Sequence, residues 1–85
     1  QSAPDVVFVG GGASPSLFAH LFEILPRGTR LVANAVTLET EALLTALHAD
    51  KGGDLMRIDL SYAKPLGRMR GWESVRSVVQ WAVAL

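Results

Sequence analysis

Two apolar runs, each followed by a helix signal, constrain the fold of this chain more than any other feature. Residues 5–9 form a short run rich in β-branched side chains, closed by Gly10, Gly11 and Gly12, and residues 30–36 form a second run. Short apolar runs without polar alternation are typical of strands that are buried on both faces of a sheet. The sequence therefore predicts two interior strands.

A helix is predicted after each strand. The first covers residues 14–25, where Ser14 can cap the helix, Pro15 suits its first turn, and Leu17, Leu21 and Leu25 form an apolar stripe. The second covers residues 37–50, with Thr37 as a candidate cap and two acids, Glu39 and Glu41, near its positive end. Strand and helix alternation indicates an α/β fold with a parallel sheet.

The remaining residues predict an edge strand, a loop and a last strand. Apolar and polar side chains alternate over residues 54–62, residues 63–74 hold Pro65, Gly67 and Gly71 without a usable period, and residues 75–83 are apolar again. A loop this short cannot hold a helical crossover, so the last strand is expected to run antiparallel to the others. Trp72, within this loop, is interpreted as a core side chain.

The helices are expected on one face of the sheet. Successive right-handed crossovers that progress in one direction place both connecting helices on the same side. The other face would then expose Val7 or Phe8 and Val32 or Ala33, and with 49% hydrophobic residues in only 85 the chain has more apolar surface than it can bury alone. We therefore expect a piece of a larger domain, a homo-oligomer, or both.

Composition excludes several classes of function. Eight basic and eight acidic residues give no net charge, so no field favours nucleic acid or an acidic membrane. Without cysteine there is no disulfide and no thiolate metal site, and no metal site is expected at His20 or His48, which stand alone on the predicted helices. No apolar run approaches the ~18–20 residues of a membrane span. These features predict a cytoplasmic protein.

The carboxyl ends of the first two strands are the predicted ligand side, because ligands of open α/β sheets bind there. Gly10, Gly11 and Gly12 let a ligand approach the backbone, although Pro15 occupies the place of the third glycine in the G-x-G-x-x-G phosphate motif. A tight turn is the alternative interpretation. Asn34 and Thr37 lie at the end of the second strand, where capping alone would explain Thr37.

A second candidate site is the basic loop. Lys64, Arg68 and Arg70 lie close together without an acid between them, and Arg can bind a carboxylate through two hydrogen bonds. A solvated turn is equally compatible with three spaced bases.

The chain resembles the C-terminal half of the precorrin-6Y methyltransferases, decarboxylating enzymes of cobalamin biosynthesis, from end to end. The resemblance rests on residues 4–12, on the segment Asn34 to Thr40, and on Pro65-Leu66-Gly67 followed by Gly71-Trp72 and by Val78-Val79-Gln80-Trp81. It implies a Rossmann-like class I methyltransferase sheet, of which this chain would supply strands in the order 4-5-7-6. Residues 1–85 would be the C-terminal portion of one methyltransferase domain whose cofactor-binding N-terminal half is absent, and this portion alone would be inactive.

The same resemblance implies a function for the candidate residues. Gly10, Gly11 and Gly12 would lie near S-adenosylmethionine, and Asn34, Thr37, Lys64, Arg68 and Arg70 would contact the precorrin substrate. Tyr62 and Glu73 depart from the family, which often has Arg at both places. No residue is identified as a catalytic base, since holding the activated methyl group in line with a ring carbon supplies much of the rate. The alternatives are a non-enzymatic α/β dimerisation module and a domain that binds a small phosphate ligand.

Overall fold

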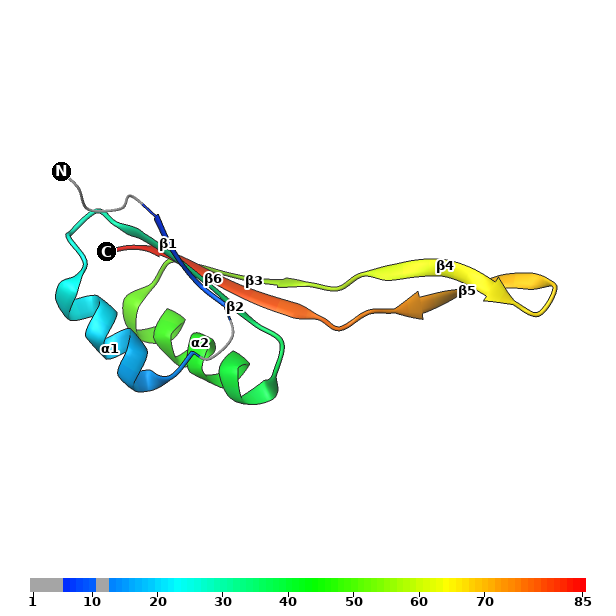
Figure 1. The fold of residues 1–85 in the computed structure, drawn as a ribbon, viewed down its shortest axis with the longest axis horizontal. Coiled ribbons are helices and arrows are strands. Elements are labelled where there is room, and N and C mark those ends of the chain that lie inside the picture. The colour runs from blue at the N-terminus through cyan, green and yellow to red at the C-terminus, as the bar shows by residue number, and fades with distance from the viewer. Residues whose placement is uncertain (1–5, 11–12) are drawn as a thin grey trace.

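The computed structural model describes residues 6–10 and 13–85, which form one α/β body and one projecting arm (Figure 1). The body contains β1 (Val6–Val9), α1 (Pro15–Ile24), β2 (Arg30–Ala35), α2 (Leu38–Lys51), β3 (Asp54–Ile58) and β6 (Val78–Ala84). The arm contains β4 (Ser61–Leu66) and β5 (Met69–Ser74).

The four strands of the body form one sheet in the order β1-β2-β6-β3. β1 and β2 are parallel, and β6 is antiparallel to both of its neighbours, β2 and β3. In the numbering of the methyltransferase fold this is the order 4-5-7-6, so the predicted topology and the reversed last strand are confirmed. The last strand begins at Val78, three residues later than predicted.

Both helices form where their caps predict. Ser14 Oγ accepts a hydrogen bond from the Leu17 amide at 3.1 Å, and Thr37 Oγ1 accepts one from the Thr40 amide at 3.2 Å. Each bond satisfies an amide that has no partner within its own helix. Glu39 and Glu41 lie in the first turn of α2, where the helix dipole favours a negative charge.

The two helices cover one face of the sheet, as predicted (Figure 1). The core lies between the helices and this face, and its buried apolar residues are Val9, Phe18, Leu31, Ala33, Ala35, Leu44, Val79, Trp81 and Val83. On the open face Phe8 is 74% exposed and Val6 is 41% exposed, whereas Ala33 points into the core. Of the residues expected on the bare face, Phe8 is therefore the exposed one on β1.

The predicted loop over residues 63–74 is wrong. β4 and β5 pair antiparallel, with Leu66 opposite Met69 around a turn of Gly67 and Arg68. Gly67 has a φ of 63°, which the first central residue of a two-residue hairpin turn of type II′ requires and which glycine adopts without strain. The predicted strand over residues 54–62 is also divided, because β3 ends at Ile58 and β4 begins at Ser61.

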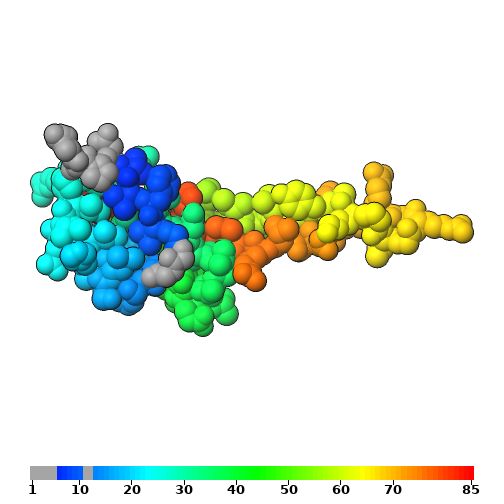
Figure 2. Space-filling view, viewed as in Figure 1, coloured from blue at the N-terminus to red at the C-terminus, as the bar shows by residue number. Residues whose placement is uncertain are grey.

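The predicted core position of Trp72 is wrong as well. Its side chain is 79% exposed on the arm, which Figure 2 shows extending away from the body. No helix in the described residues is long and apolar enough to cross a membrane.

Candidate functional site

The carboxyl edge of the sheet brings three of the predicted site residues to the same end of the body. Val9 of β1 lies opposite Ala33 of β2, so Gly10, which follows β1, is placed next to Asn34, the following residue of β2. Thr37 follows two residues beyond the end of β2. Gly11 and Gly12 lie outside the described residues. The parallel pairing therefore produces the juxtaposition that the sequence predicts.

The polar groups at this edge are already ordered. Asn34 lies on the open face of the sheet, and its Oδ1 accepts a hydrogen bond from Gln80 Nε2 at 3.0 Å. Thr37 Oγ1 caps α2 and donates to Thr40 Oγ1 at 3.0 Å. Because Gln80 occupies the Asn34 side-chain oxygen, the amide nitrogen is the remaining polar group of this exposed side chain. The edge can thus present an oriented donor to a ligand on the open face.

Space for a ligand is available at Gly10. This residue is exposed, and a Cβ atom added there would meet no heavy atom of the described residues within 4 Å. A ligand can therefore approach the backbone at the end of β1. No group of three or more metal-ligating side chains is found in the described residues.

The three predicted basic residues lie elsewhere, along the arm. Asn34 is level with Met56 of β3 through their shared partner Gln80. Lys64 lies eight residues beyond Met56, which corresponds to roughly 25 Å at about 3.3 Å per residue. The structure therefore does not bring Lys64, Arg68 and Arg70 of one chain close to its own Gly10 and Asn34.

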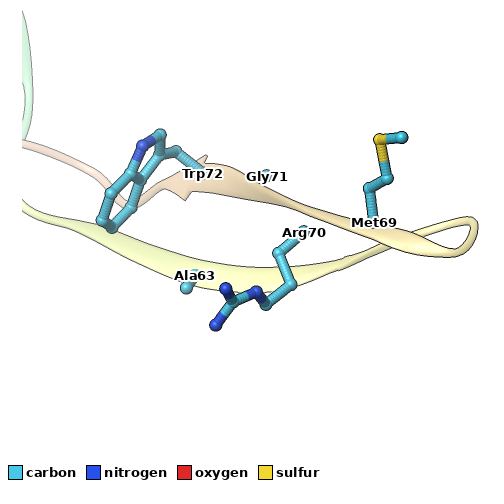
Figure 3. A pocket seen from close by; sticks show the side chains of 5 residues that line it. All are labelled: Ala63, Met69, Arg70, Gly71 and Trp72. Atoms are coloured by element: carbon cyan, nitrogen blue, oxygen red, sulfur yellow. The ribbon is translucent and has the colours of Figure 1, made fainter.

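The arm bases also differ among themselves. Lys64 Nζ forms an ion pair with Glu73 Oε1 at 2.6 Å, so one of the three bases already has a partner within the arm. Arg68 lies in the turn at the tip, and Arg70 lines a shallow hollow of about 500 Å³ with Ala63, Met69, Gly71 and Trp72 (Figure 3). Among the described residues, Arg68 and Arg70 have no ion-pair partner. These two are the bases available to a carboxylate.

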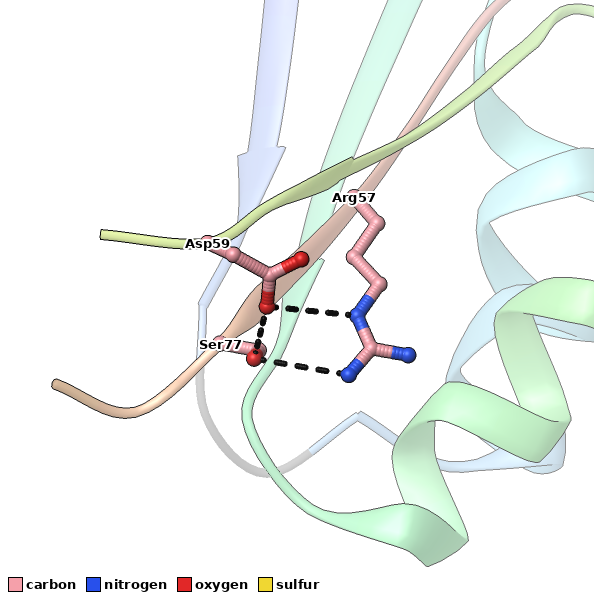
Figure 4. A network of polar contacts seen from close by, with 3 residues as sticks. All are labelled: Arg57, Asp59 and Ser77. Carbon is pink, nitrogen blue, oxygen red and sulfur yellow. Dashed lines mark hydrogen bonds and ion pairs between the residues drawn. The ribbon is translucent and has the colours of Figure 1, made fainter. Parts of the chain in front are cut away.

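A polar network at the base of the arm was not predicted from the sequence. Asp59 accepts hydrogen bonds from Ser77 Oγ and from Arg57 Nε, the latter at 3.4 Å, and Arg57 Nη2 donates to Ser77 Oγ at 3.5 Å (Figure 4). Asp59 follows β3 and Ser77 precedes β6, so the network joins the two chain segments from which the arm emerges. The hydrogen bond from Ser77, followed by the charge of Arg57, holds the pKa of Asp59 below its ordinary value of 3.8.

We expect Asp59→Asn to lower the melting temperature slightly at pH 7, and we expect this effect to disappear as the pH falls through the depressed pKa of Asp59. Because the folded pKa is depressed, the carboxylate stabilises the fold above pH 3.8, and this contribution is lost as the pH falls through the lower folded value. The effect is small because both Arg57 and Asp59 are largely exposed. Thermal melting across this pH range is the measurement, with Asp54→Asn at the start of β3 as control. A deficit that persists at low pH would contradict the carboxylate argument.

The sheet order, with its reversed last strand, is that of the Rossmann-like methyltransferases. Comparison with known families is more specific, since the profile of the precorrin methyltransferase domain matches residues 1–85. The chain belongs to this family.

The names of similar proteins are consistent with this family. A precorrin-6Y C(5,15)-methyltransferase (decarboxylating) of Sinorhizobium sp is 48% identical over 80 residues, which are 93% of this chain and 19% of that protein. The protein of the same name from Mycobacterium tuberculosis is 43% identical over 81 residues, 94% of this chain and 21% of that protein. The chain thus spans about a fifth of the length of these relatives.

A solved structure has the same fold and a similar sequence. The C-terminal domain of precorrin-6Y C5,15-methyltransferase from Rhodobacter capsulatus superposes with a TM-score of 0.93 and is 55% identical. The match covers 100% of this chain and 46% of that domain. The body and the arm together therefore correspond to about half of a known methyltransferase domain.

Proposed function

We propose that this chain is the C-terminal portion of a single methyltransferase domain in a cytoplasmic enzyme of cobalamin biosynthesis. The enzyme would methylate a precorrin with S-adenosylmethionine and remove carbon dioxide from an acetate side chain. The observation that carries the proposal is the 55% identity and TM-score of 0.93 over the whole chain to a precorrin-6Y C5,15-methyltransferase domain. Neither a dimerisation module nor a phosphate-binding domain explains this likeness over the full chain.

The unobstructed backbone at Gly10 is compatible with S-adenosylmethionine lying beside it, but the described residues there offer little to hold the cofactor. Gly10 has room for a ligand, and Gly10, Gly11 and Gly12 would line the reacting end of the cofactor. When bound, the cofactor supplies an activated methyl group. The main binding segments would belong to the other half of the domain, so we propose that the 85-residue chain alone is inactive and binds the cofactor weakly.

The residues of this chain would orient the substrate. The free amide donor of Asn34, which Gln80 holds in place, would bind a polar group of the macrocycle beside the end of β1. Thr37 would fix the adjacent start of α2 and lie beside the same substrate. Lys64, Arg68 and Arg70 would bind precorrin carboxylates, with Arg68 and Arg70 contributing more because Glu73 already pairs with Lys64. Positioning of this kind supplies rate without a base from this chain.

The proposed enzyme would work as a homo-oligomer. Phe8 on the open face and Trp72 on the arm are 74% and 79% exposed, and large apolar side chains at such exposure are typical of surfaces that are covered in an assembly.

The double variant Arg68→Ala/Arg70→Ala in the full-length enzyme tests the proposed function. We expect the KM for the precorrin to rise about 10- to 100-fold, the usual effect of losing a charged hydrogen bond to a carboxylate. Affinity for S-adenosylmethionine and the melting temperature should stay unchanged, because both side chains are exposed on the arm. The measurements are steady-state methylation, calorimetric titration and thermal melting.

Arg27→Ala is the matched control, since Arg27 is exposed in the turn between α1 and β2. An equal loss of melting temperature and substrate affinity in the double variant would give both arginines a structural function instead. A wild-type enzyme that transfers no methyl group to a precorrin would refute the proposed function itself.

A further inference from the structure

Asn34 and Gln80 form a polar pair within an apolar part of the open face of the sheet. The two residues lie directly opposite each other on β2 and β6, and Gln80 Nε2 donates to Asn34 Oδ1 at 3.0 Å. Residues two positions apart on a strand share a face, and so do residues directly opposite on neighbouring strands. The residues in these positions around the pair are all apolar, namely Val32, Val78, Ala82 and Met56.

The stability of the sheet does not account for two amides at this position. β2 and β6 are already paired over six residues, so one side-chain bond adds little to their association. A hydrogen bond between neutral side chains contributes little net stability, and replacing both partners with apolar side chains of similar shape is often neutral. Two β-branched residues would suit opposing strands at least as well. The pair is therefore better explained by a ligand that forms a hydrogen bond here.

Gln80 determines which polar atom of Asn34 is left for a ligand. A side-chain amide has one oxygen that accepts and one NH₂ group that donates. Because Gln80 donates to the oxygen of Asn34, the group left over is Nδ2, a donor. The opposite orientation of the two amides would leave the Asn34 oxygen, an acceptor, for the ligand. Gln80 thus sets the polarity of this edge of the sheet.

The Asn34 donor borders open space at the end of β1. Gly10 is placed next to Asn34, and a Cβ atom added to Gly10 would meet no described heavy atom within 4 Å. Phe8, two residues before Gly10, is 74% exposed and lies opposite Val32 on the same open face. This arrangement suits a flat apolar ring that lies against Phe8 and Val32 and carries an acceptor on its edge.

We propose that Gln80 is a positioning residue that determines specificity. By holding the Asn34 amide as a donor, Gln80 selects a ligand that has an oxygen acceptor, a carbonyl or a carboxylate, at the edge of an apolar ring. The proposal rests on the proposed function, in which the ligand is the precorrin. It deepens that function by naming the chemical group that the sheet edge recognises and the residue that sets the preference.

Two variants of Gln80 in the full-length enzyme separate the orientation of Asn34 from the shape of the site. Gln80→Glu keeps the shape but accepts instead of donating, so Asn34 turns its Nδ2 to the new carboxylate and presents its oxygen to the ligand. Gln80→Met keeps the length and has no hydrogen to donate, so Asn34 keeps its donor but is no longer held. We expect kcat/KM for the precorrin to fall about 10- to 100-fold in Gln80→Glu and less than about 10-fold in Gln80→Met.

Asn34→Asp tests the same donor from the other side of the pair. The aspartate still accepts from Gln80, but an oxygen replaces the free NH₂ group, so we expect a loss of kcat/KM similar to that of Gln80→Glu. Asp54→Asn is the matched control, because it exchanges a carboxylate for an amide on the same face at the start of β3 and should leave kcat/KM unchanged. Thermal melting and titration with S-adenosylmethionine should give wild-type values for all four variants.

Three kinetic results would overturn the proposal. They are a Gln80→Glu enzyme that is no worse than Gln80→Met, an Asn34→Asp enzyme with wild-type kcat/KM, and losses of kcat/KM that follow losses of melting temperature across the variants. The last result would give the pair a structural function only.

Neutron diffraction from crystals of the deuterated wild-type protein tests the orientation without any substrate or variant. Deuterium on nitrogen distinguishes the amide nitrogen from the oxygen, which X-ray data at ordinary resolution do not. We expect the ND₂ group of Gln80 to face Asn34 Oδ1, and the opposite orientation would overturn the proposal even if a variant fails to fold. A wild-type enzyme that transfers no methyl group would instead refute the proposed function and leave the neutron result to decide the orientation.

Discussion

Replacing Trp81 with alanine is expected to lower the free energy of unfolding by about 3–5 kcal/mol, the usual cost of truncating a large buried aromatic side chain. Trp81 lies in β6, is fully buried, and packs edge-on against Phe18 and Phe22 with ring centroids 6.1 and 6.4 Å away. It therefore holds α1 against the sheet. A loss of this size is a large part of the ~5–15 kcal/mol that stabilises a typical domain.

Urea unfolding of the wild type and of Trp81→Ala measures the loss. Trp81→Phe is the matched variant, because it keeps an aromatic ring and loses the hydrogen bond from Trp81 Nε1 to the Gly52 carbonyl at 2.8 Å. We expect a clearly smaller loss for phenylalanine, since the Gly52 carbonyl belongs to an exposed residue and can accept from water. Equal losses in the two variants would show that the hydrogen bond, and not the packing, dominates.

The body could be predicted from the sequence because its signals are local. The apolar runs that became β1 and β2 and the caps Ser14 and Thr37 each lie within a few residues of the element they specify. The direction of β6 followed from the length of the segment before it, which is too short for a helical crossover. Handedness then placed both helices on one face.

The arm could not be predicted from burial periodicity, because none of its strand side chains is buried in the described structure. Pro65 and Gly71 suggest a loop, yet Pro65 is tolerated where no ladder bond is required and Gly71 pairs with Lys64. The usable signal was Gly67-Arg68, a two-residue turn with glycine first, between two runs of equal length. Trp72 was interpreted as a core side chain because tryptophan is usually buried, whereas its place on the hairpin leaves it 79% exposed.

The candidate site was predictable where it depends on the parallel strands. Gly10 and Asn34 share an edge because β1 and β2 run in the same direction. Lys64, Arg68 and Arg70 formed a second candidate site and were assigned the same substrate only through the family resemblance, which does not indicate how far the hairpin projects from the body. The Asp59 network also escaped prediction, since Ser77 lies 18 residues away in the sequence.

Replacing Gly53 with alanine is expected to destabilise the fold by roughly 3 kcal/mol or more, through backbone strain and a steric clash together. Gly53 connects α2 to β3 and has a φ of 88°, which side chains other than glycine rarely adopt. A Cβ atom there would overlap the backbone oxygen of Ala82 and come within 2.9 Å of Val83 Cβ. Neither neighbour can move freely, because β6 is the central strand that pairs with both β2 and β3.

Gly52→Ala separates the two causes. Gly52 has a φ of 78°, similar to that of Gly53, but an added Cβ would meet no described heavy atom within 4 Å. This variant should therefore lose only the backbone strain of a conformation that glycine alone adopts readily, with φ 78° and ψ −149°, which costs about 1–3 kcal/mol. The amide of residue 52 still donates to the His48 carbonyl, at 2.9 Å in the wild type, so the end of α2 is kept. Urea unfolding of both variants gives the difference, and equal losses would mean that β6 yields to the extra methyl group at no cost.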